Sequence, residues 1–132
     1  MRITKLVLAA VLATSFLVCC DKPLAAEKVV ANTAKLYYEY LLEGKYDEFV
    51  AGIDRRLSPS DSYNAQMRDN AKMFVHRQKE LHKGIEAISA VNAEVDKKAH
   101  SANAFLVIQY SDSTSEQVVV PMVERDGVWL MR

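Results

Sequence analysis

The sequence predicts an α+β domain in which three N-terminal helices pack on a strongly curved four-stranded antiparallel sheet, preceded by a signal peptide. Two observations lead to this prediction. Apolar residues recur at helical spacing up to about Lys83 and alternate in the manner of strands from Ile85 onward. The first twenty residues combine a basic start with an apolar run, as targeting segments do.

Length and charge limit the classes of protein that are possible. The chain has 132 residues, of which 50% are hydrophobic, so it is long enough for one domain with a real core and too short for two. It carries 17 basic and 17 acidic side chains. A nucleic-acid partner is not expected, because binding to phosphates needs a basic surface.

The amino terminus reads as a secretion signal. Arg2 and Lys5 are followed by an apolar run from Leu6 to Cys19, and these 14 residues are fewer than the ~20 that span a bilayer as a helix. We therefore exclude this segment from the fold.

The end of this segment, Leu17-Val18-Cys19-Cys20-Asp21, resembles the lipobox of bacterial lipoproteins. The resemblance implies that residues 1–19 are a lipoprotein signal peptide and that Cys20 receives the acyl chains. The protein would then be anchored to a membrane of the cell envelope, facing the periplasm or the cell exterior. Cys19 stands where the motif has Ala, Gly or Ser, so lipidation of Cys19 and ordinary cleavage near residues 24–26 remain alternatives. The chain has no further cysteine, so no disulfide or cysteine metal site is expected in the mature domain.

After a tether over residues 20–26, the domain over residues 27–132 begins with three predicted helices. The first covers Glu27 to Glu43 and ends before Gly44, and the second lies within Lys45 to Ile53. The third, from Asp61 to Lys83, is capped by Ser60 or Asp61 and is the longest periodic pattern in the chain. Its apolar stripe is expected to face the sheet as the inner wall of the fold, and consists of Tyr63, Met67, Ala71, Phe74, Gln78 and Leu81.

Four strands should follow. Alternation over residues 85–95 places Ile85, Ala87, Ser89, Val91, Ala93 and Val95 on the core side. Strands over residues 104–110, 116–124 and 128–131 come next, and Asp126-Gly127 is a strong signal for a two-residue hairpin. Pro121 interrupts the third strand, where a bulge or bend is expected to curl the sheet.

The order of these elements resembles a known superfamily. Together with Tyr110-Ser111-Asp112-Ser113-Thr114 and the stretch from Val120 to Trp129 (VPMVERDGVW), it is similar to small lipoprotein families of unknown function within the nuclear transport factor 2-like superfamily. The resemblance covers about Glu27 to Arg132. It implies a bent sheet that closes over the long helix as a cone, sometimes with a pocket inside. The superfamily also contains enzymes, among them ketosteroid isomerase and scytalone dehydratase.

Seven side chains are candidates for the lining of such a pocket, although aromatic residues also fill cores of this size. They are Tyr37, Tyr40, Phe49, Met67, Phe74, Tyr110 and Trp129. Another apolar group, Val118, Val119, Val120 and Val123, suggests a sheet face that pairs two subunits.

No catalytic residue, metal site or cofactor is predicted. The inward positions of the strands offer polar groups only at Ser89, Gln109, Tyr110 and Gln117, and the three histidines are expected to be solvated. Asp54 stands beside two arginines and is expected to be solvated or ion-paired.

These observations favour a non-catalytic binding module for a small apolar ligand or a protein partner. One alternative is an isomerase or dehydratase that uses Tyr37, Tyr40 or Asp54. The other is a purely structural homodimer.

Overall fold

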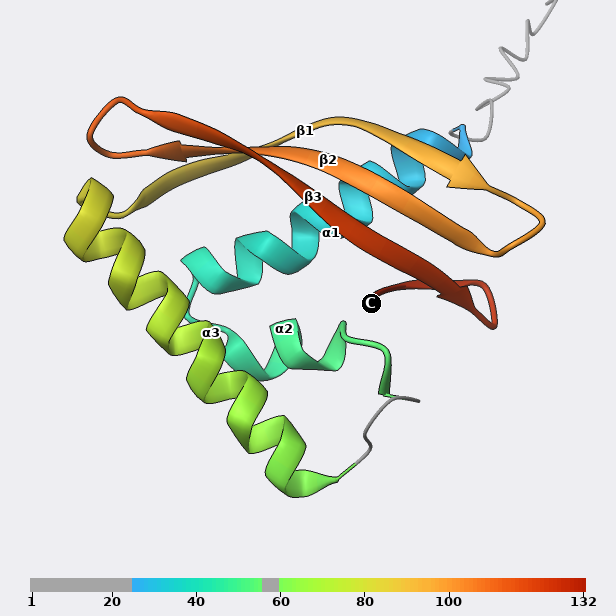
Figure 1. The fold of residues 1–132 in the computed structure, drawn as a ribbon, viewed down its shortest axis with the longest axis horizontal. Coiled ribbons are helices and arrows are strands. Elements are labelled where there is room, and N and C mark those ends of the chain that lie inside the picture. Colours follow the sequence, from blue (N-terminus) through green and yellow to red (C-terminus); the bar gives the residue numbers. More distant parts are fainter. Residues whose placement is uncertain (1–24, 56–59) are drawn as a thin grey trace, which may run out of the picture.

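The computed structural model describes residues 25–55 and 60–132. The predicted signal peptide, Cys20 and most of the tether lie outside the described residues. Within them the α+β prediction is confirmed, because three helices precede a four-stranded sheet (Figure 1). The elements are α1 (Ala26–Leu42), α2 (Tyr46–Ala51), α3 (Asp61–His82), β1 (Ile85–Asp96), β2 (Ser101–Tyr110), β3 (Ser115–Arg125) and β4 (Val128–Met131).

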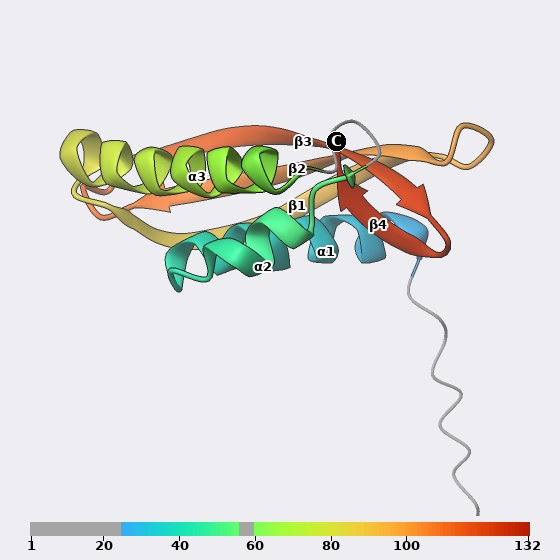
Figure 2. The ribbon, with the colours of Figure 1, turned by 90° about the horizontal axis from the view of Figure 1, so that it is seen from below.

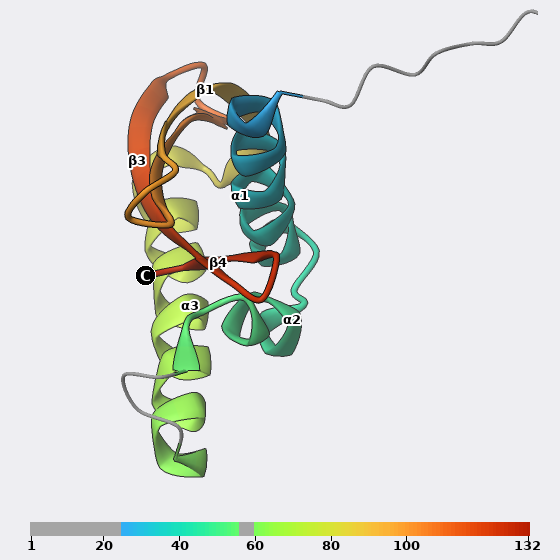
Figure 3. The ribbon, with the colours of Figure 1, turned by 90° about the vertical axis from the view of Figure 1, so that its right-hand side faces the viewer.

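The sheet is the predicted antiparallel meander, with the spatial order β1-β2-β3-β4. The predicted hairpin between β3 and β4 is present. Asp126 and Gly127 have φ angles of 53° and 80°, as a type I′ turn requires at both central positions. Figures 2 and 3 show a curled, open sheet with α1 on its concave side, while none of the three described helices covers the outer face.

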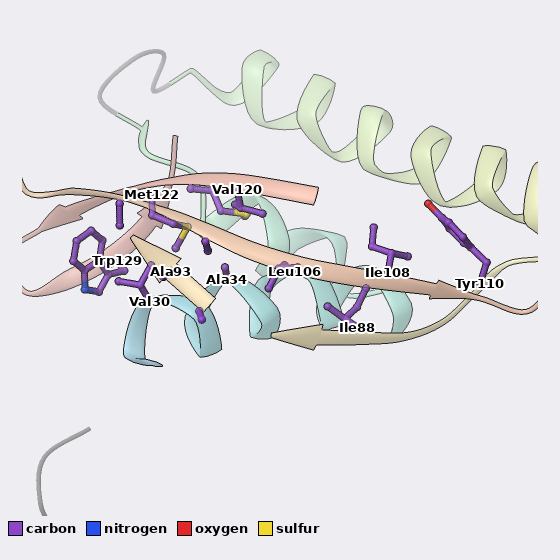
Figure 4. Packing of buried hydrophobic residues seen from close by; sticks show 14 residues of the cluster. Val30, Ala34, Ile88, Ala93, Leu106, Ile108, Tyr110, Val120, Met122 and Trp129 are labelled. Atoms are coloured by element: carbon purple, nitrogen blue, oxygen red, sulfur yellow. The ribbon is translucent and has the colours of Figure 1, made fainter. Parts of the chain in front are cut away.

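The first helix supplies the helical side of the core. Val30 and Ala34 of α1 are fully buried, and they belong to one cluster with residues of all four strands (Figure 4). The buried members are Val30, Ala31, Ala34, Ile88, Ala93, Ala102, Ala104, Leu106, Ile108, Tyr110, Val120, Met122, Trp129 and Met131. The alanines on both the helix and the sheet let the two backbones approach closely.

The expectation that α3 forms the inner wall is therefore wrong in part. Its start and its cap are confirmed, since the Ser60 side chain accepts a hydrogen bond from the Tyr63 amide at 3.2 Å, and the helix ends at His82, one residue before the predicted end at Lys83. Within α3, however, only Ala71 and Gln78 are buried, and Leu81 of the predicted apolar stripe is 65% exposed. α1 occupies the concave face instead, because its small residues fit closer to the strands.

The alternation predicted for β1 fails in the middle of the strand. The pairing with β2 shifts register between Ile85 and Ala87 and again between Ala90 and Asn92, as β-bulges do. Each extra residue moves the following side chains to the opposite face. Ile88 and Ala90 consequently contact the core, whereas Ser89, predicted to point inward, pairs with Val107 on the outer face.

The bulge predicted at Pro121 is absent. The β2–β3 pairing runs through Asn103 and Pro121 without a shift. The carbonyl oxygen of Pro121 accepts a hydrogen bond from the Arg132 amide, so the proline nitrogen points to the same side, away from β2. Because this nitrogen faces away from β2, its missing N–H removes no hydrogen bond between β2 and β3. On the other side of β3, the pairing with β4 begins only at Met122.

Candidate functional site

An apolar groove lies where the three helices meet. Its volume is about 300 Å³, which is at the lower limit of small-molecule sites. The lining residues are Tyr38 and Leu41 of α1, Phe49 of α2, Ile53 after α2, and Met67, Asn70, Ala71 and Phe74 of α3. Larger hollows, of about 580 and about 610 Å³, carry charged side chains such as Arg77 and Asp47, as solvated surfaces do.

Helical spacing brings these side chains together. Met67, Ala71 and Phe74 follow one another at steps of four and three residues and so share one face of α3. On the other side, the rings of Tyr38 and Phe49 pack edge to face with their centroids 6.0 Å apart.

Two polar groups stand among the apolar walls. The Tyr38 hydroxyl is protonated at neutral pH and can donate a hydrogen bond, because the ordinary pKa of tyrosine is 10.0 and burial raises the pKa of Tyr38 further. The side-chain carbonyl of Asn70 accepts a hydrogen bond from Gln66 at 2.9 Å, which holds the amide in place. The groove thus combines apolar walls with two orienting groups, as ligand sites commonly do.

The structure brings only three of the seven predicted pocket residues to this groove, namely Phe49, Met67 and Phe74. Tyr37 instead donates a hydrogen bond to the Trp129 carbonyl oxygen at 2.7 Å, and its ring lies 6.5 Å from that of Tyr40. Trp129 is buried in the main core.

Sequence reasoning did not identify the other five lining residues, which are Tyr38, Leu41, Ile53, Asn70 and Ala71. A signal for two of them was available, because Ala34, Tyr38 and Leu41 are spaced at four and three residues along α1. Which aromatic of the pair Tyr37 and Tyr38 faces the groove depends on how α1 is rotated against the sheet. Periodicity alone does not give this rotation.

Asp54 is buried and does not line the groove. Its carboxylate lies 3.2 Å from the Arg125 guanidinium, and its backbone amide donates to the Met131 carbonyl at 2.7 Å. Of the two predicted alternatives, the structure shows the ion pair, with a partner from the far end of β3, and not the solvated state, since Asp54 is 3% exposed. This pair ties the segment after α2 to the β3–β4 hairpin.

A second polar cluster joins the end of α3 to the turn between β2 and β3. His82 stacks on Tyr110 with ring centroids 4.1 Å apart, and its Nδ1 lies 2.9 Å from Asp112 Oδ2. The prediction that this histidine is solvated is wrong, since its side chain is only 31% exposed. His76 and His100 are exposed, as predicted.

Electrostatics and hydrogen bonds stabilise this cluster. Hydrogen bonds from the Thr114 side chain and backbone lower the pKa of Asp112 to about 2. Burial and the hydrogen bond to Glu116 raise the pKa of Tyr110 to about 12.

The arrangement of this cluster differs from that of a catalytic triad. The Thr114 hydroxyl lies 3.3 Å from His82 Nδ1 and also forms a hydrogen bond with Asp112, so the hydroxyl and the carboxylate both contact the same ring nitrogen of His82. In acyl-transfer triads they engage opposite nitrogens.

Residues 25–55 and 60–132 contain no group of three or more histidine, cysteine or acidic side chains placed to hold a metal ion. None of the described helices has the length and hydropathy of a membrane-spanning segment.

The fold is of the nuclear transport factor 2-like class, as comparison with solved structures shows. A protein from Campylobacter jejuni, named "Putative NTF2-like transpeptidase", superimposes with a TM-score of 0.63 over 76% of this chain and 94% of its own. The two sequences are 17% identical, so the likeness extends to the fold alone. No family model and no curated protein matches the chain.

Proposed function

We propose that this chain is a non-catalytic binding module of the cell envelope, anchored by lipid at Cys20, which takes a small apolar ligand in the groove between α1, α2 and α3. The observation that supports this most directly is the composition of the groove. Its walls are mostly apolar side chains from the three helices and the segment after α2, and neither a carboxylate nor a histidine is among the lining residues. Such a lining favours binding by burial of apolar surface over acid–base chemistry.

The binding proposal is tested with the apolar fluorophore N-phenyl-1-naphthylamine. We expect its fluorescence to rise on addition of the protein, because the naphthyl ring leaves water for the groove. Met67→Trp should fill the groove and weaken binding by at least about tenfold, a loss of about 1.4 kcal/mol.

The matched control is Met73→Trp, which makes the same change on the same helix at a side chain that is 63% exposed and lies outside the groove. This variant should bind the fluorophore as the parent protein does. Equal binding by both variants would show that the probe sits elsewhere and would remove the groove as the site.

The anchor is supported by the lipobox-like sequence that ends at Cys20. Cells grown with labelled palmitate should incorporate it into the parent protein and into Cys19→Ser, but not into Cys20→Ser. A single acylated cysteine that carries several chains is enough for stable anchoring, since each buried CH₂ contributes about 0.8 kcal/mol. Label that persists in Cys20→Ser would contradict the assignment.

The name of the Campylobacter jejuni protein raises acyl transfer as an alternative. The described residues place a hydroxyl, a histidine and a carboxylate together at Thr114, His82 and Asp112. Because the hydroxyl and the carboxylate share one ring nitrogen, the histidine has no free nitrogen facing the hydroxyl to remove its proton. Neither Tyr37, Tyr40 nor Asp54, the residues considered for isomerase chemistry, lines the groove. Both observations favour the binding proposal.

A further inference from the structure

A second apolar stripe runs along the exposed side of α1. It consists of Val29, Thr33, Leu36 and Tyr40, which follow one another at helical steps of four, three and four residues. Val29 and Leu36 are 37% and 46% exposed, and Tyr40 is half-buried. We refer to these four residues as the outer stripe. Figure 3 shows α1 on one flank of the molecule and α3 on the opposite flank.

The outer stripe lies away from the core and from the groove. The core side of α1 carries Val30 and Ala34, and its groove side carries Tyr38 and Leu41. Successive residues of an α-helix are rotated by about 100°, so these four side chains lie about 90–170° around the helix from the middle of the stripe. The stripe is therefore apolar surface that the fold leaves in contact with water.

The predicted anchor brings a bilayer close to this helix. Cys20 precedes Ala26, the first residue of α1, by six positions. Six residues of extended chain span at most about 22 Å, so the start of α1 stays within that distance of an acylated Cys20. So short a tether makes contact between α1 and the bilayer an intramolecular event, and a surface of modest affinity is then sufficient for binding.

We propose that α1 lies flat on the bilayer surface, with the outer stripe inserted among the lipid headgroups. This inference rests on the proposed lipid anchor. From Val29 to Tyr40 the stripe extends about 16 Å along the helix. Helices that lie in a membrane surface bury such a face about 5–10 Å into the boundary between headgroups and acyl chains. Tyrosine favours this depth, because its ring is apolar and its hydroxyl is polar.

The charges beside the outer stripe suit this surface. Three lysines flank the stripe, namely Lys28, Lys35 and Lys45. Lys35 pairs with Glu39 at 3.3 Å and Lys45 with Glu43 at 2.9 Å, so the neighbouring acidic side chains are neutralised. Lys28 adds a positive charge, which attracts anionic headgroups. Lysine side chains can also extend along apolar surface and keep their ammonium groups at the level of the phosphates.

This orientation leaves the groove open to water. Tyr38 and Leu41 line the groove from the side of α1 that faces away from the outer stripe. Helix α3, which forms the opposite wall of the groove, lies on the flank away from the bilayer (Figures 2 and 3). The outer stripe and the groove can therefore be occupied at the same time.

The test compares how close two positions of the full, lipidated chain come to the lipids of phosphatidylethanolamine–phosphatidylglycerol vesicles. The chain has no cysteine besides Cys19 and Cys20. Once Cys19 is removed with the signal peptide and Cys20 is acylated, an introduced cysteine is the single site for the thiol-reactive fluorophore NBD. Asn32→Cys places NBD at an exposed position beside the outer stripe, and Met73→Cys places it on α3, at a side chain that is 63% exposed.

Lipids with a nitroxide near the headgroup should quench NBD at position 32 at least about twice as strongly as at position 73, because the stripe lies among the headgroups. Leu36→Glu puts a charge into the stripe and should reduce the quenching at position 32 to the level at position 73. Leu81→Glu is the matched control. It makes the same change at a leucine of α3 that is 65% exposed, and should leave the quenching at position 32 unchanged.

Circular dichroism shows whether each variant is folded, and Leu36→Gln replaces Leu36→Glu if the latter does not fold. Equal quenching at the two positions, in a chain that floats with the vesicles, would overturn this proposal and leave the anchor in place. Quenching at position 32 that a folded Leu36 variant does not reduce would overturn it as well. A parent chain that does not float with the vesicles would remove the anchor, and this proposal with it.

Discussion

Tyr37 joins α1 to β4 through one hydrogen bond, from its hydroxyl to the Trp129 carbonyl oxygen. Arg125 and Val128 flank the two-residue turn as a hydrogen-bonded pair, so the Trp129 carbonyl, one residue further, points away from β3. Tyr37 gives this carbonyl a partner. The ring is thus held in one position, directly beside the backbone of Gly52.

Gly52→Ala is expected to destabilise the fold by about 1–3 kcal/mol. The new methyl carbon would lie 2.5 Å from two carbons of the Tyr37 ring. The φ of Gly52 is −82°, so the cause is this close approach and not backbone strain. Urea denaturation measures the loss, and Tyr37→Leu in the same background should recover part of it. Unchanged stability of Gly52→Ala would mean that the ring moves freely.

Asp112 should make stability depend on pH in the acid range. Its pKa is about 2 in the folded chain and 3.8 ordinarily, chiefly because the Thr114 side chain donates a hydrogen bond to the carboxylate. A lowered pKa stabilises the fold fully above about 3.8, and this stabilisation is lost as pH falls toward 2. Asp112→Asn should therefore lower the melting temperature at pH 6 more than at pH 2. A difference that stays constant over this range would contradict the assignment.

Among the elements, α1 and α3 differ in what they contribute to the core. α1 buries Val30, Ala31, Ala34 and Leu41, whereas α3, although longer, buries only Ala71 and Gln78. α3 is fixed mainly along the groove and at its carboxyl end, where His82 meets the β2–β3 turn.

The same substitution at two leucines measures this difference. Leu106→Ala, at a fully buried position of β2, should cost about 2–5 kcal/mol of unfolding free energy. Leu81→Ala, at an exposed position of α3, should change it by no more than about 0.5 kcal/mol. Urea denaturation of both variants provides the comparison, and a large loss for Leu81→Ala would place α3 in the core after all.

The number and order of the elements followed from the sequence because helical and alternating periods differ strongly on either side of Gly84. The face that β1 buries could not be predicted from the sequence, because a bulge inserts only one extra residue into a strand and is not visible in the composition. Three of the groove residues, Phe49, Met67 and Phe74, could be predicted because they belong to the same helical periodicity. The rest, such as Asn70 and Ile53, depend on how α2 and α3 are placed against α1, and sequence periodicity does not determine this packing.

At the scale of the whole molecule, the groove lies toward the carboxyl end of α1, whereas the predicted anchor precedes this helix in the sequence. The first turn of α1 lies near the end of β1 (Figure 1). Ala26, where the helix begins, lines a hollow with Val95 and His100 of the β1–β2 region. Its 17 residues span about 25 Å, and Leu41 near the far end lines the groove. An anchored chain would therefore present its groove to a ligand or partner away from the site of lipidation.

Stability should also differ along the chain. Amides of α3 are expected to exchange with solvent at least about tenfold faster than those of β2, because fewer buried contacts hold this helix. N-phenyl-1-naphthylamine in the groove should slow amide exchange in α3 and leave the exchange rate of β2 nearly unchanged. The reason is that the ligand stabilises α3 in its packed position and does not contact the sheet. Hydrogen–deuterium exchange with mass spectrometry of peptides from residues 61–82 and 101–110 measures both effects. Equal exchange in the two segments, with or without the probe, would mean that the domain opens only as one unit, and the groove could then not admit ligands by moving α3.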